Sequence, residues 1–271
     1  MNMKLFLNRN IFYKEKKNIY SFLLIIFFLI PLFSYSQHYQ DLLNKRIIDK
    51  PFGKIIEKNS INLNTEIYPA GGLLVETYYG ISEKFAAGIS FGGNNIIGYS
   101  TIKYNKYPGF YAIFELLEDS PFYPSIHLGL ETQGSGYYSE NYNRFQFLQP
   151  GIFFVISKYF DWEGKFIISF GINRTVNLFE NKDEYKNLDA YLGLQKNIGK
   201  WFLINLEYDC AFNDNDKKEF GQGKGYLNLG FSFRLFKDYS MIIKFNIKDI
   251  LRNNKIGENF RTIGFNYIWF L

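Results

Sequence analysis

The sequence predicts an all-β protein, namely an antiparallel transmembrane β-barrel of the outer-membrane type with about 12 strands. Segments of about ten residues alternate between apolar and polar side chains, which is the length that a tilted strand needs to cross a bilayer. The connectors between these segments are alternately short and long. The composition also favours strands, because 30 Phe and 22 Tyr suit sheets and 23 Gly suit turns and crowded interiors.

The first 36 residues read as a cleavable signal peptide. Basic residues from Lys4 to Lys17 precede the apolar run "SFLLIIFFLIPLF" (21–33), which is too short for a comfortable membrane span. "SYSQ" then places small residues at the cleavage positions, and we expect the cut between Ser36 and Gln37. An uncleaved signal anchor is the alternative interpretation.

Cleavage changes what the charge and the cysteine count imply. It would remove five of the 31 Lys and Arg and one of the 26 Asp and Glu, leaving 26 basic and 25 acidic residues. This balance gives no basis for nucleic-acid binding. Cys210 is the single cysteine, so the sequence predicts neither an intrachain disulfide nor a cysteine-based metal site.

Residues 37–59 are interpreted as a short periplasmic segment before the barrel. Leu42, Leu43, Ile47 and Ile48 recur at near-helical spacing, which suggests a short helix. Such a segment could plug the lumen or contact a partner. Disorder after the signal peptide is the alternative.

The barrel itself is predicted over residues 60–271. Its expected strands are 61–68, 73–80, 85–91, 109–117, 123–132, 147–158, 165–175, 188–196, 201–212, 225–236, 240–250 and 260–271.

One face of these strands is apolar and the other is polar. In "YLNLGFSFRLF" (226–236) every second residue from Leu227 is Leu or Phe, and the alternate set begins Tyr, Asn, Gly. The polar faces carry too many charges for a dry core, so we expect them to line a water-filled lumen while the apolar faces contact lipid. The candidate lumen-lining residues are His127, Glu131, Glu207, Asp209, Arg234, Lys244 and Lys248.

The connectors fit this topology. Short turns at 81–84, 118–121, 161–164, 197–200 and 237–239 alternate with long loops at 133–146, 176–187, 213–224 and 251–259. With both ends of the barrel in the periplasm, every one of these long loops lies outside. The terminal "FNYIWFL" alternates aromatics, as in barrels passed to the outer-membrane assembly machinery, although Leu271 takes the last place where Phe is usual.

Several segments resemble a known family. They are "FAAGISFGGNNIIGY", "YPGFYAIFELLED", "PSIHLGLETQGSGYY", "NRFQFLQPGIFFVISKYF", "LEYDCAFNDN", "GKGYLNLGFSFRL" and "IKDILRNNK". In this order they are similar to the barrel portion of YjbH-like bacterial outer-membrane proteins, over about residues 60–271. The resemblance implies a barrel fold and an association with exopolysaccharide production.

Motifs that could carry chemistry each have a simpler interpretation. His127 and Glu131 could form an acid–base or metal pair, but strand residues four apart are separated by roughly 13 Å. "NDNDKKEFGQGKG" (213–225) could bind calcium or be a solvated loop, and the aromatic loop 132–145 could contact a glycan or simply fold. The charges of strands 201–212, 225–236 and 240–250 suit cross-strand ion pairs slightly better than pore selectivity.

The sequence therefore predicts a non-enzymatic barrel of the outer membrane with no cofactor and no metal. A channel or an export or surface-structure component is the first hypothesis, and the resemblance adds the exopolysaccharide link. A lipid-acting enzyme and a barrel-anchored surface-binding protein are the alternatives, because the fold does not fix the function. The expected partners are outer-membrane lipid, the assembly machinery and a polysaccharide or small solute.

Overall fold

The computed structural model describes residues 45–140, 143–161, 165–176, 187–214, 221–235, 240–254 and 260–271. The predicted signal peptide and residues 37–44 lie outside the described residues. Within the described ranges, no helix is long and apolar enough to cross a membrane.

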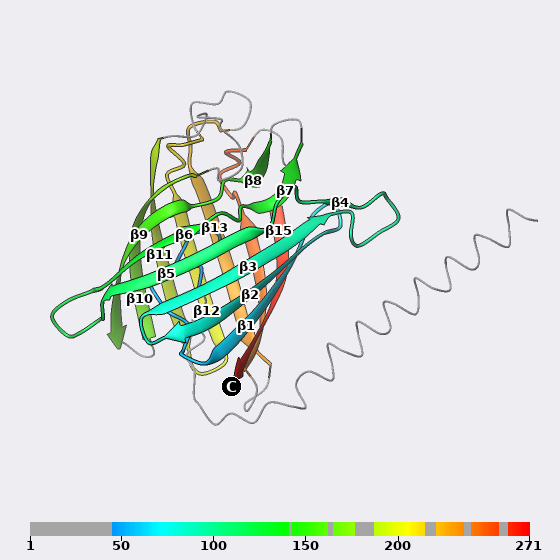
Figure 1. The fold of residues 1–271 in the computed structure, drawn as a ribbon. Coiled ribbons are helices and arrows are strands. Elements are labelled where there is room, and N and C mark those ends of the chain that lie inside the picture. The colour runs from blue at the N-terminus through cyan, green and yellow to red at the C-terminus, as the bar shows by residue number, and fades with distance from the viewer. Residues whose placement is uncertain are drawn as a thin grey trace, which may run out of the picture. The chain divides into compact units, whose positions relative to one another are not determined.

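Twelve antiparallel strands close into a barrel, which confirms the predicted fold class (Figure 1). Each strand pairs with its neighbours in chain order, and β1 closes the ring by pairing with β15, with Ser60 opposite Phe270. The barrel strands are β1 (Ser60–Tyr68), β2 (Gly72–Ser82), β3 (Phe85–Asn94), β5 (Gly109–Leu117), β6 (Ser125–Glu131), β9 (Gly151–Asp161), β10 (Lys165–Arg174), β11 (Leu188–Ile198), β12 (Phe202–Asp209), β13 (Tyr226–Arg234), β14 (Ser240–Lys248) and β15 (Phe260–Phe270).

Three short strands lie outside this ring order. The two-residue strand β4 (Lys103–Tyr104) extends the end of β3, whereas β7 (Ser135–Ser139) and β8 (Arg144–Phe147) form a separate hairpin. The predicted strand 147–158 begins later than expected because Phe147 ends β8. Pro150 lacks a backbone donor and Gly151 has φ 71°, so the chain breaks between β8 and β9.

The two ends of the barrel differ as predicted. Short connectors join β2 to β3, β5 to β6, β9 to β10, β11 to β12 and β13 to β14, and the strand ends that they join lie at the end of the barrel where the chain terminates (Figure 1). The strand ends that the long connectors join lie at the opposite end. One connector there is short, because Ala70 (φ 64°) and Gly71 (φ 60°) form a tight turn between β1 and β2.

The barrel is apolar outside and polar inside. Ile89, Ile152 and Phe170 point outward and are 60%, 52% and 51% exposed, while the polar side chains that alternate with such residues are buried. In β13, Asn228 and Ser232 are buried and Phe233 is exposed. The apolar face therefore points outward, which is the arrangement typical of a transmembrane barrel.

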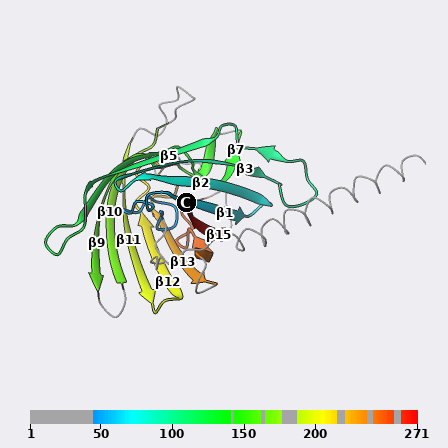
Figure 2. The same cartoon turned by 60° about the horizontal axis from the view of Figure 1, so that its bottom comes forward.

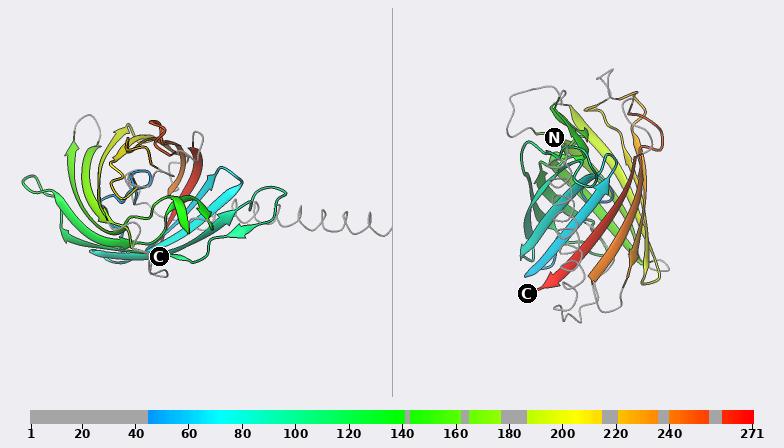
Figure 3. Two further views of the ribbon diagram at one scale, coloured as in Figure 1. Left: turned by 90° about the horizontal axis from the view of Figure 1, so that it is seen from above. Right: turned by 90° about the vertical axis from the view of Figure 1, so that its right-hand side faces the viewer.

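Part of the barrel interior is occupied by the chain itself. Residues 45–58, here called the plug, lie inside the ring of strands, where Figures 2 and 3 show the segment in blue. Ile47, Ile48 and Phe52 of the plug form a buried cluster with Ile167 and Tyr191 of the wall. The plug thus obstructs the predicted lumen in this conformation, which is one of the roles suggested for residues 37–59.

The plug is not helical over its described residues. Its first part is a tight hairpin in which Arg46 and Pro51 form a bridge, Ile47 N donates to Lys50 O at 2.9 Å and Phe52 N donates to Lys45 O at 2.8 Å. Ile47 and Ile48, which suggested a helix, instead pack against the barrel wall. Leu42 and Leu43 lie outside the described residues.

The plugged lumen as candidate functional site

Two cationic side chains of the plug lie in a box of wall residues, here called the cation box: Glu76, Tyr78, Tyr111 and Glu131. Glu76 and Tyr78 share the inner face of β2, and Tyr111 of β5 is the cross-strand partner of Glu131 of β6. Side chains from three strands therefore converge on one point inside the barrel.

Lys45 and Arg46 both use the carboxylates of this box. Lys45 Nζ lies 2.8 Å from Glu131 Oε1 and 3.7 Å from Glu76 Oε1. Arg46 Nη2 lies 3.0 Å from Glu76 Oε1, and Arg46 Nε donates to Glu131 Oε1 at 2.9 Å. Because the two acidic side chains are 0% and 1% exposed, these ion pairs are almost fully removed from water.

Aromatic rings complete the box. The ammonium group of Lys45 lies 3.5 Å from the ring centroid of Tyr78 and 4.1 Å from that of Tyr111. A cation over an aromatic face is attracted by the ring quadrupole, more strongly where water is excluded. Burial, and next the neighbouring Arg46, nevertheless lower the pKa of Lys45 to about 8.

A second carboxylate pair binds Lys50. Its Nζ lies 2.8 Å from Asp189 Oδ2 on β11 and 2.9 Å from Asp209 Oδ2 on β12. Burial lowers the pKa of Lys50, but the two carboxylates outweigh it and the net pKa is raised above the usual range. Lys50 therefore stays protonated, and Tyr191 Oη adds a hydrogen bond to Pro51 O at 3.0 Å.

Glu207 binds the backbone of the plug. Its carboxylate accepts hydrogen bonds from the N–H groups of Ile48, Asp49 and Lys50, the shortest to each being 2.9, 3.0 and 2.9 Å. Successive N–H groups that point the same way form an anion-binding nest. Asn228 Nδ2 donates to the other carboxylate oxygen at 2.8 Å, which fixes its orientation.

Lys248 connects the plug, the wall and the long-loop end. Its Nζ lies 2.8 Å from Asp49 Oδ1 of the plug and 2.7 Å from Glu66 Oε1 of β1. It also donates to Ser135 Oγ of β7 at 2.6 Å. The Lys248 side chain is fully buried, so it joins three separate parts of the fold in one cluster.

The β7–β8 hairpin packs into the long-loop end of the barrel. Phe147 forms edge contacts with Tyr226 and Phe260 at centroid distances of 5.2 and 5.3 Å. Arg144 forms a two-pronged ion pair with Asp214, at 2.6 and 3.1 Å. The loop predicted at 133–146 is thus partly buried, and Gln133, Arg144 and Phe145 are unavailable for the glycan contact that sequence suggested.

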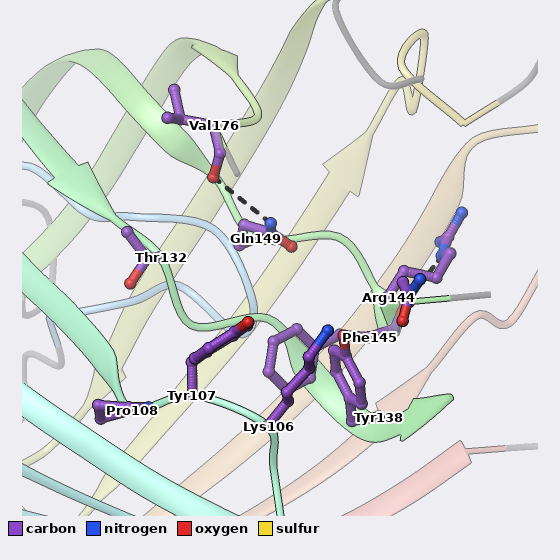
Figure 4. A pocket seen from close by; sticks show the side chains of 10 residues that line it. Lys106, Tyr107, Pro108, Thr132, Tyr138, Arg144, Phe145, Gln149 and Val176 are labelled. Atoms are coloured by element: carbon purple, nitrogen blue, oxygen red, sulfur yellow. Dashed lines mark hydrogen bonds between the residues drawn. The ribbon is translucent and has the colours of Figure 1, made fainter. Parts of the chain in front are cut away.

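A small hollow remains beside this hairpin (Figure 4). Lys106, Tyr107 and Tyr138 line it, and Gln149 at its edge donates to Val176 O at 3.5 Å. The calcium interpretation of 213–225 receives no support from the described part of that loop, where Asp214 pairs with Arg144. Residues 215–220 lie outside the described residues.

The candidate lumen-lining residues have different partners. Glu131, Glu207, Asp209 and Lys248 all bind the plug. The preferred interpretation of the charges on β12 to β14 as cross-strand ion pairs does not hold for Glu207 and Asp209, to which the plug supplies the N–H donors or the opposite charge. Lys248 pairs both with Asp49 of the plug and with Glu66 of the wall.

The remaining candidates lie elsewhere along the wall. His127 is buried, with Nε2 3.4 Å from Glu115 Oε1, so it and Glu131 contact different partners. Lys244 is half-buried and donates to Asn64 Oδ1 at 3.0 Å. Arg234 is half-buried at the last position of β13, at the short-turn end.

Sequence reasoning did not single out the basic residues of the plug or three wall carboxylates: Lys45, Arg46, Lys50, Glu66, Glu76 and Asp189. One signal was present in the sequence. "KRIIDK" (45–50) concentrates three cations directly before a barrel whose buried charged side chains are mostly acidic.

These features define the class of protein: a 12-stranded β-barrel of the transmembrane type whose lumen is closed by a segment of its own chain. No family model and no curated protein matches the chain. The solved structures that are similar to it include three at low identity. The KdgM porin has a TM-score of 0.46 and 9% identity, covering 77% of this chain and 98% of that one.

The KdgM porin in complex with disordered oligogalacturonate gives a TM-score of 0.45 and 10% identity over the same shares of the two chains. The N-terminal β-barrel domain of Pseudomonas aeruginosa OprF gives a TM-score of 0.22 and 10% identity, covering 78% of this chain and 98% of that one. Values this low transfer neither a ligand nor an activity.

Proposed function

We propose that this chain is a non-enzymatic outer-membrane channel that its own plug holds closed. The observation that carries the proposal is the set of buried ion pairs between Lys45, Arg46 and Lys50 and the barrel wall. The outward apolar face supports a location in lipid, and the polar inner face supports a solute path.

The chemistry of the plug supports release rather than permanent closure. A plug with a purely structural role could be packed with apolar side chains, which stabilise a buried contact as well as or better than ion pairs do. Ion pairs and backbone hydrogen bonds can instead be exchanged for water or for a charged solute. The plug contacts therefore suit a gate that opens.

Conductance in planar bilayers tests this proposal. We expect the purified full chain to be mostly closed, and Lys50→Gln to open more often because Asp189 and Asp209 lose their cation. Lys158→Gln is the matched control, since Lys158 pairs with Asp119 in a partly exposed ion pair near the short-turn end rather than with the plug. A protein that conducts in neither the native nor the Lys50→Gln form would contradict the channel assignment.

A heat-modifiability gel on purified outer membranes tests the location. An unboiled band that migrates differently from the boiled band, and that resists protease, is the expected result for a closed barrel in that membrane. Recovery of the protein in the soluble periplasmic fraction would contradict it.

The resemblance to YjbH-like proteins extends the proposal to exopolysaccharide export. It rests on sequence resemblance alone. Loss of surface polysaccharide after deletion of the gene, restored by the native chain, would support this extension.

A further inference from the structure

The cation box has features that a plain cluster of acidic residues lacks. Two carboxylates and two aromatic rings surround the Lys45 ammonium group, and all four wall side chains are at least nine-tenths buried. Carboxylates together with aromatic faces are the groups that recognise organic cations. The box already contains an ammonium group and a guanidinium group, both from the plug.

The plug does not use all the polar atoms of the box. Glu131 Oε2 and Tyr111 Oη are buried and have no hydrogen-bond partner among the described residues. A buried acceptor or donor without a partner costs free energy. The box therefore has unused hydrogen-bonding capacity directed at its cationic occupants.

The wall favours cations along the rest of the lumen as well. The buried carboxylates on the described barrel strands outnumber the buried basic side chains, for which Lys248 is the single example in those strands. A lumen whose charged side chains are mostly of one sign attracts the opposite sign. These carboxylates are Glu66, Glu76, Glu131, Asp189, Glu207 and Asp209.

We propose that Glu76, Tyr78, Tyr111 and Glu131 form a binding site for an organic cation with primary ammonium or guanidinium groups. Lys45 and Arg46 occupy this site while the plug is in place, so the ligand and the plug compete for the same carboxylates. The inference rests on the proposed channel, because it names the class of solute that the opened lumen admits.

Agmatine is the probe, since it carries one primary ammonium and one guanidinium group. Isothermal titration calorimetry on the full chain in detergent would compare the native protein with a Lys45→Ala/Arg46→Ala variant. We expect the double variant to bind agmatine at least tenfold more tightly, because the truncations empty the box and leave its carboxylates. Glutarate, a dianion of similar length, is expected to bind neither protein.

Two further substitutions in the double variant locate the site. Glu131→Gln is expected to weaken agmatine binding at least tenfold. Glu83→Gln is the matched control, because it removes the same charge from an exposed turn and should leave binding unchanged. Binding to the double variant that is no tighter than to the native chain, or that survives Glu131→Gln, would overturn the proposal.

Folding of the variants and conduction by the channel are measured in separate experiments. A heat-modifiability gel identifies variants that retain the barrel, and Lys45→Ala alone replaces the double variant if the latter does not fold. A chain that conducts in bilayers but binds no agmatine contradicts the cation site and leaves the channel standing. A chain that binds agmatine with the expected dependence on Glu131 but never conducts contradicts the channel and leaves the site standing.

Discussion

Lys248 Nζ lies 2.8 Å from Asp49 Oδ1, and this ion pair joins the wall of the barrel to the plug inside it. The same ammonium group also contacts Glu66 and Ser135, so the plug and the β7–β8 hairpin share one cation. The two segments that fill the lumen are therefore physically linked. A change at Lys248 should affect both.

Replacing Lys248 with Gln should destabilise the folded barrel strongly. The substitution leaves the carboxylates of Asp49 and Glu66 buried without their cation, and breaking a buried pair in this way typically costs about 3–5 kcal/mol. Urea unfolding in detergent, followed by the gel shift, would measure the loss. Lys158→Gln should cost at most about 1 kcal/mol, because its ion pair is partly solvated. Equal losses in the two variants would contradict the role given to Lys248.

Reversing the charge of Lys50 should open the plug, and reversing the charge of its partner Asp189 as well should partly close it again. Lys50→Asp places a third carboxylate beside Asp189 and Asp209, so we expect frequent openings in planar bilayers. Adding Asp189→Lys returns one cation to the cluster and should reduce the open probability. If the double variant opens as often as the single one, direct charge pairing does not hold this part of the plug.

Gly80 on β2 should be needed for the last residues of the plug to pack closely against the barrel wall. A Cβ atom at this position would lie 2.0 Å from Glu57 O, which is backbone and cannot rotate away. Gly80→Ala should therefore displace residues near Glu57 and raise the open probability. Gly264→Ala on β15 is the control, since its nearest contact would be 3.2 Å. Similar open probabilities in both variants would argue against the displacement.

The barrel could be predicted from the sequence because its signals are local. Alternation in segments such as 226–236 identifies each strand and its outward face, and connector lengths fix the two ends. The plug could not be predicted in this way. Lys50 contacts Asp189 and Asp209, which lie 139 and 159 positions away in the sequence, and no local periodicity marks such a pair. Charge was the available signal, since the cations of 45–50 match the acidic lumen.

The lowered pKa of Lys45 gives plug closure a defined pH dependence. Lys45 belongs to the plug and not to a strand, and its pKa falls from 10.5 to about 8 on closure, because burial and then Arg46 disfavour its charged form. Between pH 8 and 10.5 the closed state therefore binds fewer protons than the open state, and closure becomes more favourable as the pH rises. Below pH 8 both states keep the proton and this effect is absent.

Lys50 does not oppose this trend in the same window. The pKa of Lys50 is raised in the closed state. Its stabilisation of the closed state is therefore fully present below pH 10.5 and is lost only at higher pH. The open probability should therefore fall by up to about tenfold per pH unit between pH 8 and 10.5, as expected for one proton. Recordings of the native chain and of Lys45→Gln would measure this slope, which should be clearly shallower in the variant. A native open probability that rises with pH in this window, or a slope that is unchanged in Lys45→Gln, would show that Lys45 does not control closure.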